Sequence, residues 1–484
     1  MASVTPTLSA RAAALLLAHW REGRLSSPAY DALADAIRML VIDGRISLGA
    51  RLPAERALAD ALGLSRTTIA NAYARLREDG FLESLRGSGS VVRLPASLAG
   101  RPDPDALSGP VSEGAGLLDL RKAVLHAASG VAEATERAMR HLPAALADSG
   151  YDTVGDPGLR AAIADRYTAR GLPTRPDEIM VTLGAQHAIS LLARTLIGRG
   201  DGVLIESPTY PHAHEAFRAA GGRMVSVPVD ADHGWDLAAL TTAIRRTAPA
   251  VAYVMPDLHN PTGATMTPQG REVLLREAGD AGTLVIADET MGELRIDGGI
   301  QPPLAALGPA VLIGSSGKNF WGGLRIGWIR ADRPLLQRLV LARPTGDLGT
   351  PVLEQLIVRE LVPLTDAILE ERRRHLREGR DHLVGELRSR LPEWHVPSPA
   401  GGLTTWVNLG RPVSSALVLA TRSEGVALAS GGVFGPEGGF ERFLRLPFSG
   451  GQADRERLVG ALERAWRRVG TLETSGSPSM AAVV

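Results

Sequence analysis

Short apolar runs alternate with longer helical segments over most of the chain. The runs begin at residues 179, 202, 250, 283 and 310 and read IMVTLG, GVLIES, AVAYVMP, TLVIADE and AVLIGSS. This alternation is typical of a parallel sheet with helices on both faces. Polar or glycine-rich residues follow each run, and open α/β sheets bind their ligands at such strand ends. We therefore predict an α/β domain over residues 117–470.

Residues 1–93 show a different pattern, which is dense in helix signals. ALADALG predicts a short helix that ends at Gly63, and Ser65 can cap a second helix running through Arg77. The buried stripe of that second helix would comprise Ile69, Ala72, Tyr73 and Leu76. The stretch DGFLESLRGSGSVV then has the turn residues and alternation of a hairpin.

Two segments show no sustained periodicity. Residues 94–116 are rich in Pro, Gly, Ser and Ala, which predicts a linker between two domains. Residues 471–484, TLETSGSPSMAAVV, are predicted to form a disordered tail.

The N-terminal pattern indicates a DNA-binding surface. Two helices joined by a tight turn expose the start of the second helix, where side chains can reach base edges and phosphates in a major groove. The hairpin tip could lie along the DNA backbone or the minor groove. A helical module for protein interaction or dimerisation would share this pattern. The predicted DNA contacts are Arg56, Ser65, Arg66, Thr67, Thr68, Asn71, Arg86 and Gly87.

Charge and composition limit the classes of function. The chain has 53 acidic and 53 basic residues, so only a local patch could attract DNA. Residues 24–93 hold ten arginines and eight acidic residues, a nearly balanced count. The chain contains no cysteine, which excludes disulfides and thiolate metal ligands, and we predict no metal site. No apolar run approaches the length of a membrane span, and we expect a cytoplasmic protein.

One lysine stands out against this composition. The 53 basic residues include only two lysines, Lys122 and Lys318, and Lys318 lies in the small-residue stretch GSSGKNF. Arginine stays protonated and does not readily form an imine, whereas a lysine with a depressed pKa attacks carbonyl groups. The lysine therefore suggests imine chemistry.

Other strand ends supply groups that would accompany such a lysine. A phosphate could bind the helix start in TLGAQHAISLL, together with a hydroxyl and a guanidinium near the lysine. An aromatic face, an acid for a pyridine nitrogen and an amide for a ring hydroxyl are also present. Each of these residues alone has an equally good structural explanation, as a cap, a core residue or a turn. The set is Gly184, Ala185, Gln186, Ser315 and Arg325 for the phosphate, and Tyr210, Asp288 and Asn260 for the ring.

Residues 47–93 resemble the winged helix-turn-helix of the GntR family, through LPAER, LGLSRTT, AYARLREDGFL and GSGSVV. The resemblance implies that Arg56 holds a phosphate, that Arg66 and Thr67 lie at base edges, and that Gly87 belongs to the wing.

Residues 117–470 resemble the fold-type I aminotransferases, which carry pyridoxal 5'-phosphate (PLP). The resemblance implies that Lys318 binds PLP as a Schiff base and that Arg325 grips the phosphate. Tyr151, in YDTVGDPGLR, would reach the phosphate of a partner subunit, and Arg445, in RFLRLPFS, would bind a substrate α-carboxylate.

The two resemblances together indicate the MocR subfamily of bacterial transcriptional regulators. They imply a head-to-tail homodimer that senses an amino compound or PLP at Lys318 and changes its grip on operator DNA, without physiological turnover. A working aminotransferase with a DNA-binding head, and a DNA-binding scaffold that lacks PLP, are the alternatives. The chain departs from the family at Thr290, which replaces the usual tyrosine, and at Gly317, which often is serine. These departures affect the tuning of the cofactor rather than its anchoring.

Overall fold

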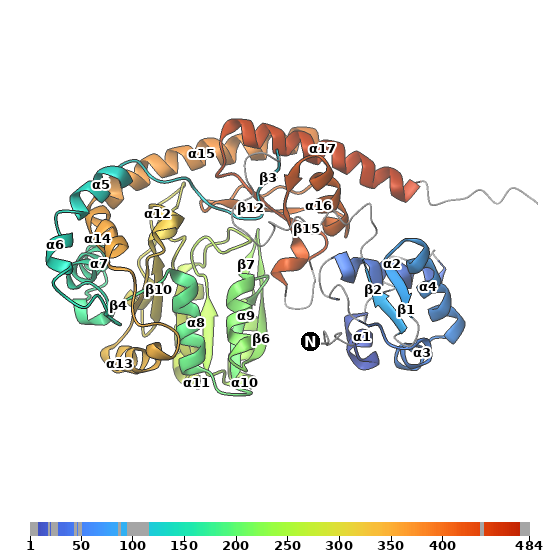
Figure 1. The fold of residues 1–484 in the computed structure, drawn as a ribbon, viewed down its shortest axis with the longest axis horizontal. Helices are drawn as coiled ribbons and strands as arrows, with labels where there is room; N and C mark the ends of the chain where they lie inside the picture. The colour runs from blue at the N-terminus through green and yellow to red at the C-terminus, as the bar shows by residue number, and fades with distance from the viewer. Residues whose placement is uncertain are drawn as a thin grey trace, which may run out of the picture.

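The computed structural model describes residues 8–17, 20, 28–42, 46, 51–85, 89–93, 116–435 and 440–474. Arg86 and Gly87, two of the predicted DNA contacts, lie outside the described residues, as do residues 94–115 of the predicted linker. Figure 1 shows a small N-terminal module and a larger body built around a sheet.

The N-terminal module is a winged helix-turn-helix. Its elements are α1 (Ala10–Leu16), α2 (Ala29–Ile42), α3 (Glu55–Leu62), α4 (Arg66–Glu78), β1 (Leu82–Leu85) and β2 (Gly89–Val92). The two strands pair antiparallel as the predicted hairpin. Gly63 ends α3 with a φ of 66°, and Ser65 caps α4 by accepting a hydrogen bond from the Thr68 N–H. All four residues of the predicted stripe on α4 are buried in the core of the module.

The body contains an eight-stranded sheet. In spatial order its strands are β4 (Ile179–Thr182), β11 (Gly327–Arg330), β10 (Val311–Ser315), β9 (Leu284–Asp288), β8 (Val251–Val254), β5 (Gly202–Ser207), β6 (Arg223–Asp230) and β7 (Gly234–Trp235). The five apolar runs in the sequence correspond to β4, β5, β8, β9 and β10.

The prediction of a parallel sheet is correct only for its centre. Strands β10, β9, β8, β5 and β6 pair in parallel, as crossover helices require. Strand β11 is antiparallel to both of its neighbours, and β7 is antiparallel to β6. Residues 231–233 separate β6 from β7, and residues 316–326, which form α12 and a 3-10 turn, separate β10 from β11. The chain therefore reverses direction at both places without a long crossover helix.

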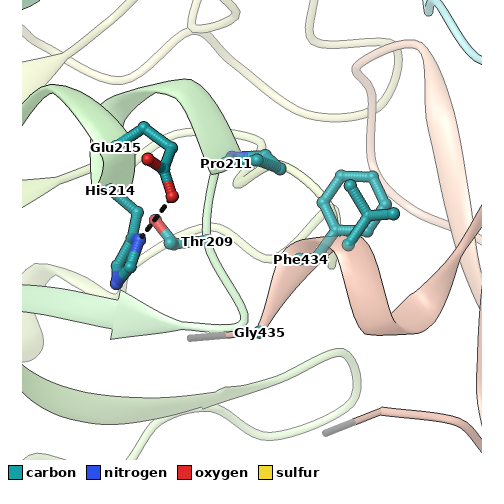
Figure 2. A pocket seen from close by; sticks show the side chains of 7 residues that line it. Thr209, Pro211, His214, Glu215, Phe434 and Gly435 are labelled. Carbon is teal, nitrogen blue, oxygen red and sulfur yellow. Dashed lines mark ion pairs between the residues drawn. The ribbon is translucent and has the colours of Figure 1, made fainter. Parts of the chain in front are cut away.

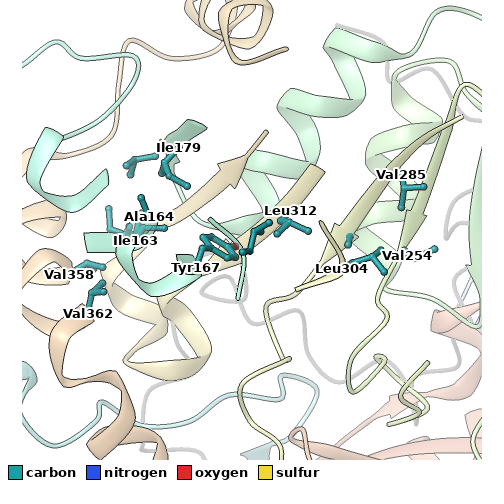
Figure 3. Packing of buried hydrophobic residues seen from close by; sticks show 14 of the residues in the cluster. Ile163, Ala164, Tyr167, Ile179, Val254, Val285, Leu304, Leu312, Val358 and Val362 are labelled. Carbon is teal, nitrogen blue, oxygen red and sulfur yellow. The ribbon is translucent and has the colours of Figure 1, made fainter. Parts of the chain in front are cut away.

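Helices cover both faces of this sheet and bury its alternating side chains. One face packs under α5 (Val131–Ala138), α7 (Pro157–Ala169), α10 (Leu237–Thr247), α11 (Pro268–Ala281) and α14 (Val352–Leu361). The other packs under α8 (Ala185–Leu196), α9 (Pro211–Ala219) and α13 (Arg333–Ala342). Figure 3 shows part of the first face, where Tyr167 lies near Leu312 and where Val254 and Val285 project from neighbouring strands. The short helices α6 (Leu142–Ala145) and α12 (Ser316–Asn319) complete this subdomain.

A second, smaller subdomain has its own core. It comprises the three-stranded sheet of β12 (Thr404–Asn408), β15 (Phe443–Pro447) and β14 (Ala429–Ser430), the pair of β3 (Leu118–Asp119) and β13 (Val426–Ala427), and the helices α15 (Thr365–Arg390), α16 (Ser414–Ser423) and α17 (Gln452–Thr474). Helix α15 links the two subdomains, because Ile368 belongs to the core of the large one and Leu369 to the core of the small one. Figure 1 shows α15 and α17 running along one edge of the body.

Helix α17 corrects the predicted start of the C-terminal tail. The helix continues to Thr474, so residues 471–474 are helical, and residues 475–484 lie outside the described residues. Among the residues that the structure describes, no helix combines the length and apolar character needed to cross a membrane.

Candidate cofactor site and DNA-binding surface

Lys318 lies in α12, a single helical turn that follows β10 directly. Its Nζ donates a hydrogen bond of 2.7 Å to the carbonyl oxygen of Ala123. Burial lowers the pKa of Lys318 to about 8, and the positive charges of Arg445 and Arg325 act in the same direction, while Asp288 opposes them. A substantial fraction of this amine is therefore neutral near physiological pH, as nucleophilic attack requires.

Asp288 lies at the end of the central strand β9, and both of its carboxyl oxygens are held. The hydroxyl of Tyr253 donates to Oδ2 at 2.7 Å, and the backbone N–H of Thr290 donates to Oδ1 at 3.0 Å. Burial raises the pKa of Asp288, whereas the bonds from Thr290 and Tyr253 lower it. The side chain is thus a fixed, buried acid at the carboxyl end of the central strands, where Lys318 also lies.

The start of α8 forms a cradle for an anion. Its N-cap, Gly184, has a φ of 79° and provides no side-chain cap, so the N–H groups of the first turn point outward. A Cβ on Gly184 would lie 2.7 Å from Nη2 of Arg325, and a Cβ on Gly327 would lie 2.5 Å from the Gly184 backbone. Only glycine at these two positions allows β11 and the Arg325 guanidinium to approach the helix end.

Ser315 and Gln186 border the same helix start. Ser315 Oγ accepts a hydrogen bond from the Gly317 N–H at 3.1 Å, so Ser315 caps the helical turn that carries the lysine. Gln186 Nε2 donates to the carbonyl of His212, while Gln186 Oε1 is buried without a hydrogen-bond partner.

Arg445 and Tyr210 form the opposite wall of the site. Arg445 is buried on β15 and donates to the Arg121 carbonyl at 2.5 Å and to Oδ1 of Asn260 at 3.3 Å. Its guanidinium lies 4.7 Å from the centre of the Phe434 ring, and its Nε is buried without a partner. Burial lowers its pKa to about 10.

Tyr210 belongs to the same group of side chains. Burial raises the pKa of Tyr210, and Asp288 raises it further, while Arg445 and Arg325 lower it. Asp288, Arg445 and Arg325 influence the pKa of both Tyr210 and Lys318, so these side chains share one site.

A pocket of about 100 Å³ adjoins this wall (Figure 2). Thr209, His214 and Glu215 lie on one side, and Phe434 lies on the other. The backbone N–H of Thr209 donates to the Phe434 carbonyl at 2.9 Å, which joins the large and small subdomains beside the site.

Tyr151 does not join the group around Lys318. Its side chain is 74% exposed. Within the described part of the chain, no hydrogen bond or ring contact connects it to the other predicted residues. The role that the resemblance gives it requires a second subunit, so this role stays a prediction.

The arrangement suits a phosphorylated pyridine aldehyde. A buried carboxylate, a partly neutral lysine and an uncapped helix start with an arginine surround one site, and buried Arg445 and Gln186 atoms lack partners there. These groups match a ring nitrogen, an aldehyde and a phosphate respectively. Thr290 holds Asp288 through its backbone N–H.

The N-terminal module presents the predicted DNA contacts to solvent. Arg66, Thr67 and Asn71 are exposed at the start of α4, Thr68 is half-buried, and Arg56 is exposed on α3. Arg66 Nε lies 3.8 Å from Oε2 of Glu55, and its side chain is 74% exposed.

Sequence reasoning missed two partners of the site. Tyr253 occupies an ordinary apolar run and reads as a core residue; only its place one strand away from Asp288 reveals the contact. Ala123 offers only a backbone carbonyl, and no pattern in the sequence marks it.

Comparison with known proteins assigns both parts of the chain. Residues 126–462 match the family described as aminotransferase class I and II, and residues 29–92 match the bacterial regulatory proteins of the gntR family. The first match spans most of the chain, so the protein belongs to the class I and II aminotransferase family and binds PLP.

The chain is similar both to transcriptional regulators and to an aminotransferase. The chain is 32% identical over 325 residues to the pyridoxine biosynthesis transcriptional regulator PdxR of Corynebacterium glutamicum, covering 66% of this chain and 69% of that protein. It is 30% identical over 333 residues to the probable rhizopine catabolism regulatory protein MocR of Rhizobium meliloti, covering 62% and 65%. The structure resembles LysN, the α-aminoadipate aminotransferase of Thermus thermophilus, with a TM-score of 0.67 and 31% identity over 74% of this chain and 94% of that one.

These findings define a DNA-binding regulator whose body has the fold of a PLP-dependent aminotransferase. The chain is a member of the MocR subfamily of GntR-type transcriptional regulators.

Proposed function

We propose that this regulator senses an amino compound, or PLP itself, through a Schiff base at Lys318. The observation that carries the proposal is the buried Lys318 amine, whose pKa is about 8, beside the fixed carboxylate of Asp288. Bound PLP supplies an aldehyde that condenses with primary amines and a ring that withdraws electrons. Sensing requires the first property alone.

The residues of this chain would divide the binding task. The first-turn N–H groups of α8, Ser315 and Arg325 would hold the phosphate, and Asp288 would keep the ring nitrogen protonated. The ring of Tyr210 would stack on the pyridine, and the amide of Asn260 would donate to its hydroxyl. Arg445 would hold a carboxylate of the incoming amine through its planar set of donors.

Dimer formation would complete each site. The exposed Tyr151 would reach the phosphate in the partner subunit, within a head-to-tail homodimer. Two N-terminal modules would then face two half-sites of an operator, as expected for helix-turn-helix dimers.

The experiment that tests this proposal compares wild-type protein with Lys318→Ala. Both are titrated with PLP while the visible absorption spectrum is recorded, and both are then titrated against DNA from the region upstream of the gene, with and without PLP. We expect a visible band in the wild type only, together with a PLP-dependent or amine-dependent change in DNA affinity. If the spectral change is complete but the DNA affinity stays the same, the proposed sensing function is wrong.

A working aminotransferase is the second candidate, because Lys318, Asp288 and Arg445 form a complete set for the reaction and LysN shares the fold. Turnover of an amino acid and a keto acid over many cycles, lost in Lys318→Ala, would favour it. A single half-reaction without further cycles would favour the sensor.

A further inference from the structure

Residues 121–126, here called the strap, cross the candidate site, and side chains from elsewhere in the body hold their backbone carbonyls. Residues 120–128 form neither helix nor strand. The contacts are Arg445 Nη2 to the Arg121 carbonyl at 2.5 Å, Lys318 Nζ to Ala123 at 2.7 Å, Ser449 Oγ to Val124 at 2.8 Å and Arg372 Nη2 to His126 at 2.6 Å. Two of these donors are the groups to which we assign cofactor and effector binding.

The strap runs between the cores of the two subdomains. Leu120 and Leu125 are buried in the core of the small subdomain, and Ala128 is buried in the core of the large one. The Ala128 N–H also donates to the carbonyl of Phe320, two residues beyond Lys318. A change in how the strap is held therefore affects both subdomains.

The N-terminal end of the strap leads to the DNA-binding module. Strand β3 immediately precedes the strap and pairs with β13 of the small subdomain. Arg457 of α17 donates to the carbonyls of Gly116 and Gly425 beside this pair. Residues 94–115, which join the strap to the DNA-binding module along the chain, come directly before Gly116.

Ligand binding must change two of the four contacts. When the neutral Lys318 amine condenses with an aldehyde, a C=N bond forms, and both amine hydrogens leave with the aldehyde oxygen as water. The imine nitrogen then has no hydrogen to donate to Ala123 unless it takes up a proton. A carboxylate on Arg445 likewise competes with the Arg121 carbonyl, because an anion is the stronger acceptor for a guanidinium.

The other two contacts are independent of ligand chemistry. Ser449 and Arg372 hold Val124 and His126, at the end of the strap away from the linker. Arg372 also donates to the carbonyls of Asn319 and Phe320. Release would therefore free the end of the strap next to the linker, while its other end stays anchored.

We propose that the strap carries the ligand signal from Lys318 and Arg445 to the linker, and through the linker to the DNA-binding module. This inference rests on the proposed function, because it requires PLP to react at Lys318. In this proposal, the signal arises when the carbonyls of Arg121 and Ala123 lose their hydrogen-bond donors. Ser449 acts as a positioning residue, because its bond to Val124 limits how far the strap can move.

A single spin label tests the proposal. The chain contains no cysteine, so Lys122→Cys supplies a unique thiol in the full-length protein, at an exposed side chain between Arg121 and Ala123 in the end of the strap that would be released. The label is recorded by electron paramagnetic resonance, with and without PLP, while the absorption spectrum reports reaction at the lysine. We expect PLP to raise the mobile fraction about twofold or more, since one hydrogen bond is lost. In Lys122→Cys with Lys318→Ala, the mobile fraction should be high in both conditions.

The outcomes separate this inference from the function on which it rests. A full visible band with an unchanged mobile fraction of the label would refute the role of the strap, while the proposed sensing at Lys318 would remain supported. Without a visible band, the proposed function fails. The comparison of the Lys318→Ala background with the parent then still decides whether the lysine anchors the strap.

A second variant links the strap to DNA binding. Ser449→Ala removes the hydroxyl that holds Val124 and should shift the DNA dissociation constant measured without PLP towards the value measured with PLP. Thr247→Val is the matched control, because the Thr247 hydroxyl donates to the Ala243 carbonyl on α10 at 2.7 Å, away from the strap. A Ser449→Ala protein that folds normally and responds to PLP like the wild type and the control would refute the coupling.

Discussion

The hydroxyl of Tyr253 donates a 2.7 Å hydrogen bond to Oδ2 of Asp288 from the neighbouring strand. Both residues are buried, and the phenol packs against Phe217 on the face that α8 and α9 cover. The bond fixes the carboxylate and favours its charged form against the cost of burial. The carboxylate that we assign to the pyridine nitrogen thus depends on a residue from a different strand.

Replacing Tyr253 with phenylalanine should weaken PLP binding. Loss of a hydrogen bond to a charged group costs about 1.5–3 kcal/mol, which corresponds to a PLP dissociation constant raised about tenfold to a hundredfold. The constant is measured by spectral titration. Tyr167→Phe is the control, because the Tyr167 hydroxyl is also buried and accepts a bond from Trp328. Equal PLP affinity in the two variants would show that Tyr253 does not contribute to PLP binding.

The pH dependence of the reaction at Lys318 should follow its lowered pKa. Only the neutral amine attacks the aldehyde, so the rate constant should rise about tenfold per pH unit below pH 8 and level off above it. Stopped-flow recording of the visible band from pH 6 to 9.5 measures this midpoint. Arg445→Gln should move the midpoint upward, because a positive charge that disfavours the ammonium is lost, whereas Arg442→Gln should not. A midpoint near the ordinary lysine value would contradict the burial of the amine.

Gly184→Ala should disrupt the phosphate cradle. The new Cβ would meet Nη2 of Arg325 at 2.7 Å, at a φ of 79° that disfavours alanine. We expect the PLP dissociation constant to rise about tenfold or more, through lost charge-assisted bonds. Gly171→Ala is the control, because Gly171 also has a positive φ, of 86°, but no atom lies within 4 Å of the new Cβ. It should lower the free energy of unfolding by about 1–3 kcal/mol and leave PLP affinity intact.

Arg66→Ala should weaken DNA binding by about 1–3 kcal/mol if the side chain reads a base edge. The matched control is Arg75→Ala on the same helix, whose guanidinium pairs with Glu78 and Asp79. Fluorescence titrations with upstream DNA at two salt concentrations distinguish the roles. A loss that is uniform across DNA sequences, with a salt slope reduced by about one, would assign Arg66 to a phosphate instead.

The sequence by itself determined the local features of this protein. Ser65 caps α4 and Gly63 ends α3 because capping depends on a few adjacent residues. The five apolar runs became strands, and Asp288 lies at a strand end as predicted, because these positions follow from local periodicity. Lys318 follows strand β10 in the short helix α12. The motifs also identified the family to which both parts of the chain belong.

The tertiary structure alone decided the partners of these residues. Lys318 and Ala123 lie 195 residues apart, and Arg445 and Arg121 lie 324 apart, so no spacing rule joins them. Strand β11 runs antiparallel because residues 316–326 bring the chain back at the same end of the sheet instead of crossing over it, which apolar composition does not reveal. A backbone carbonyl and a buried phenol carry no signature in the sequence. They gain their roles only when packing brings distant segments to the same edge of the sheet.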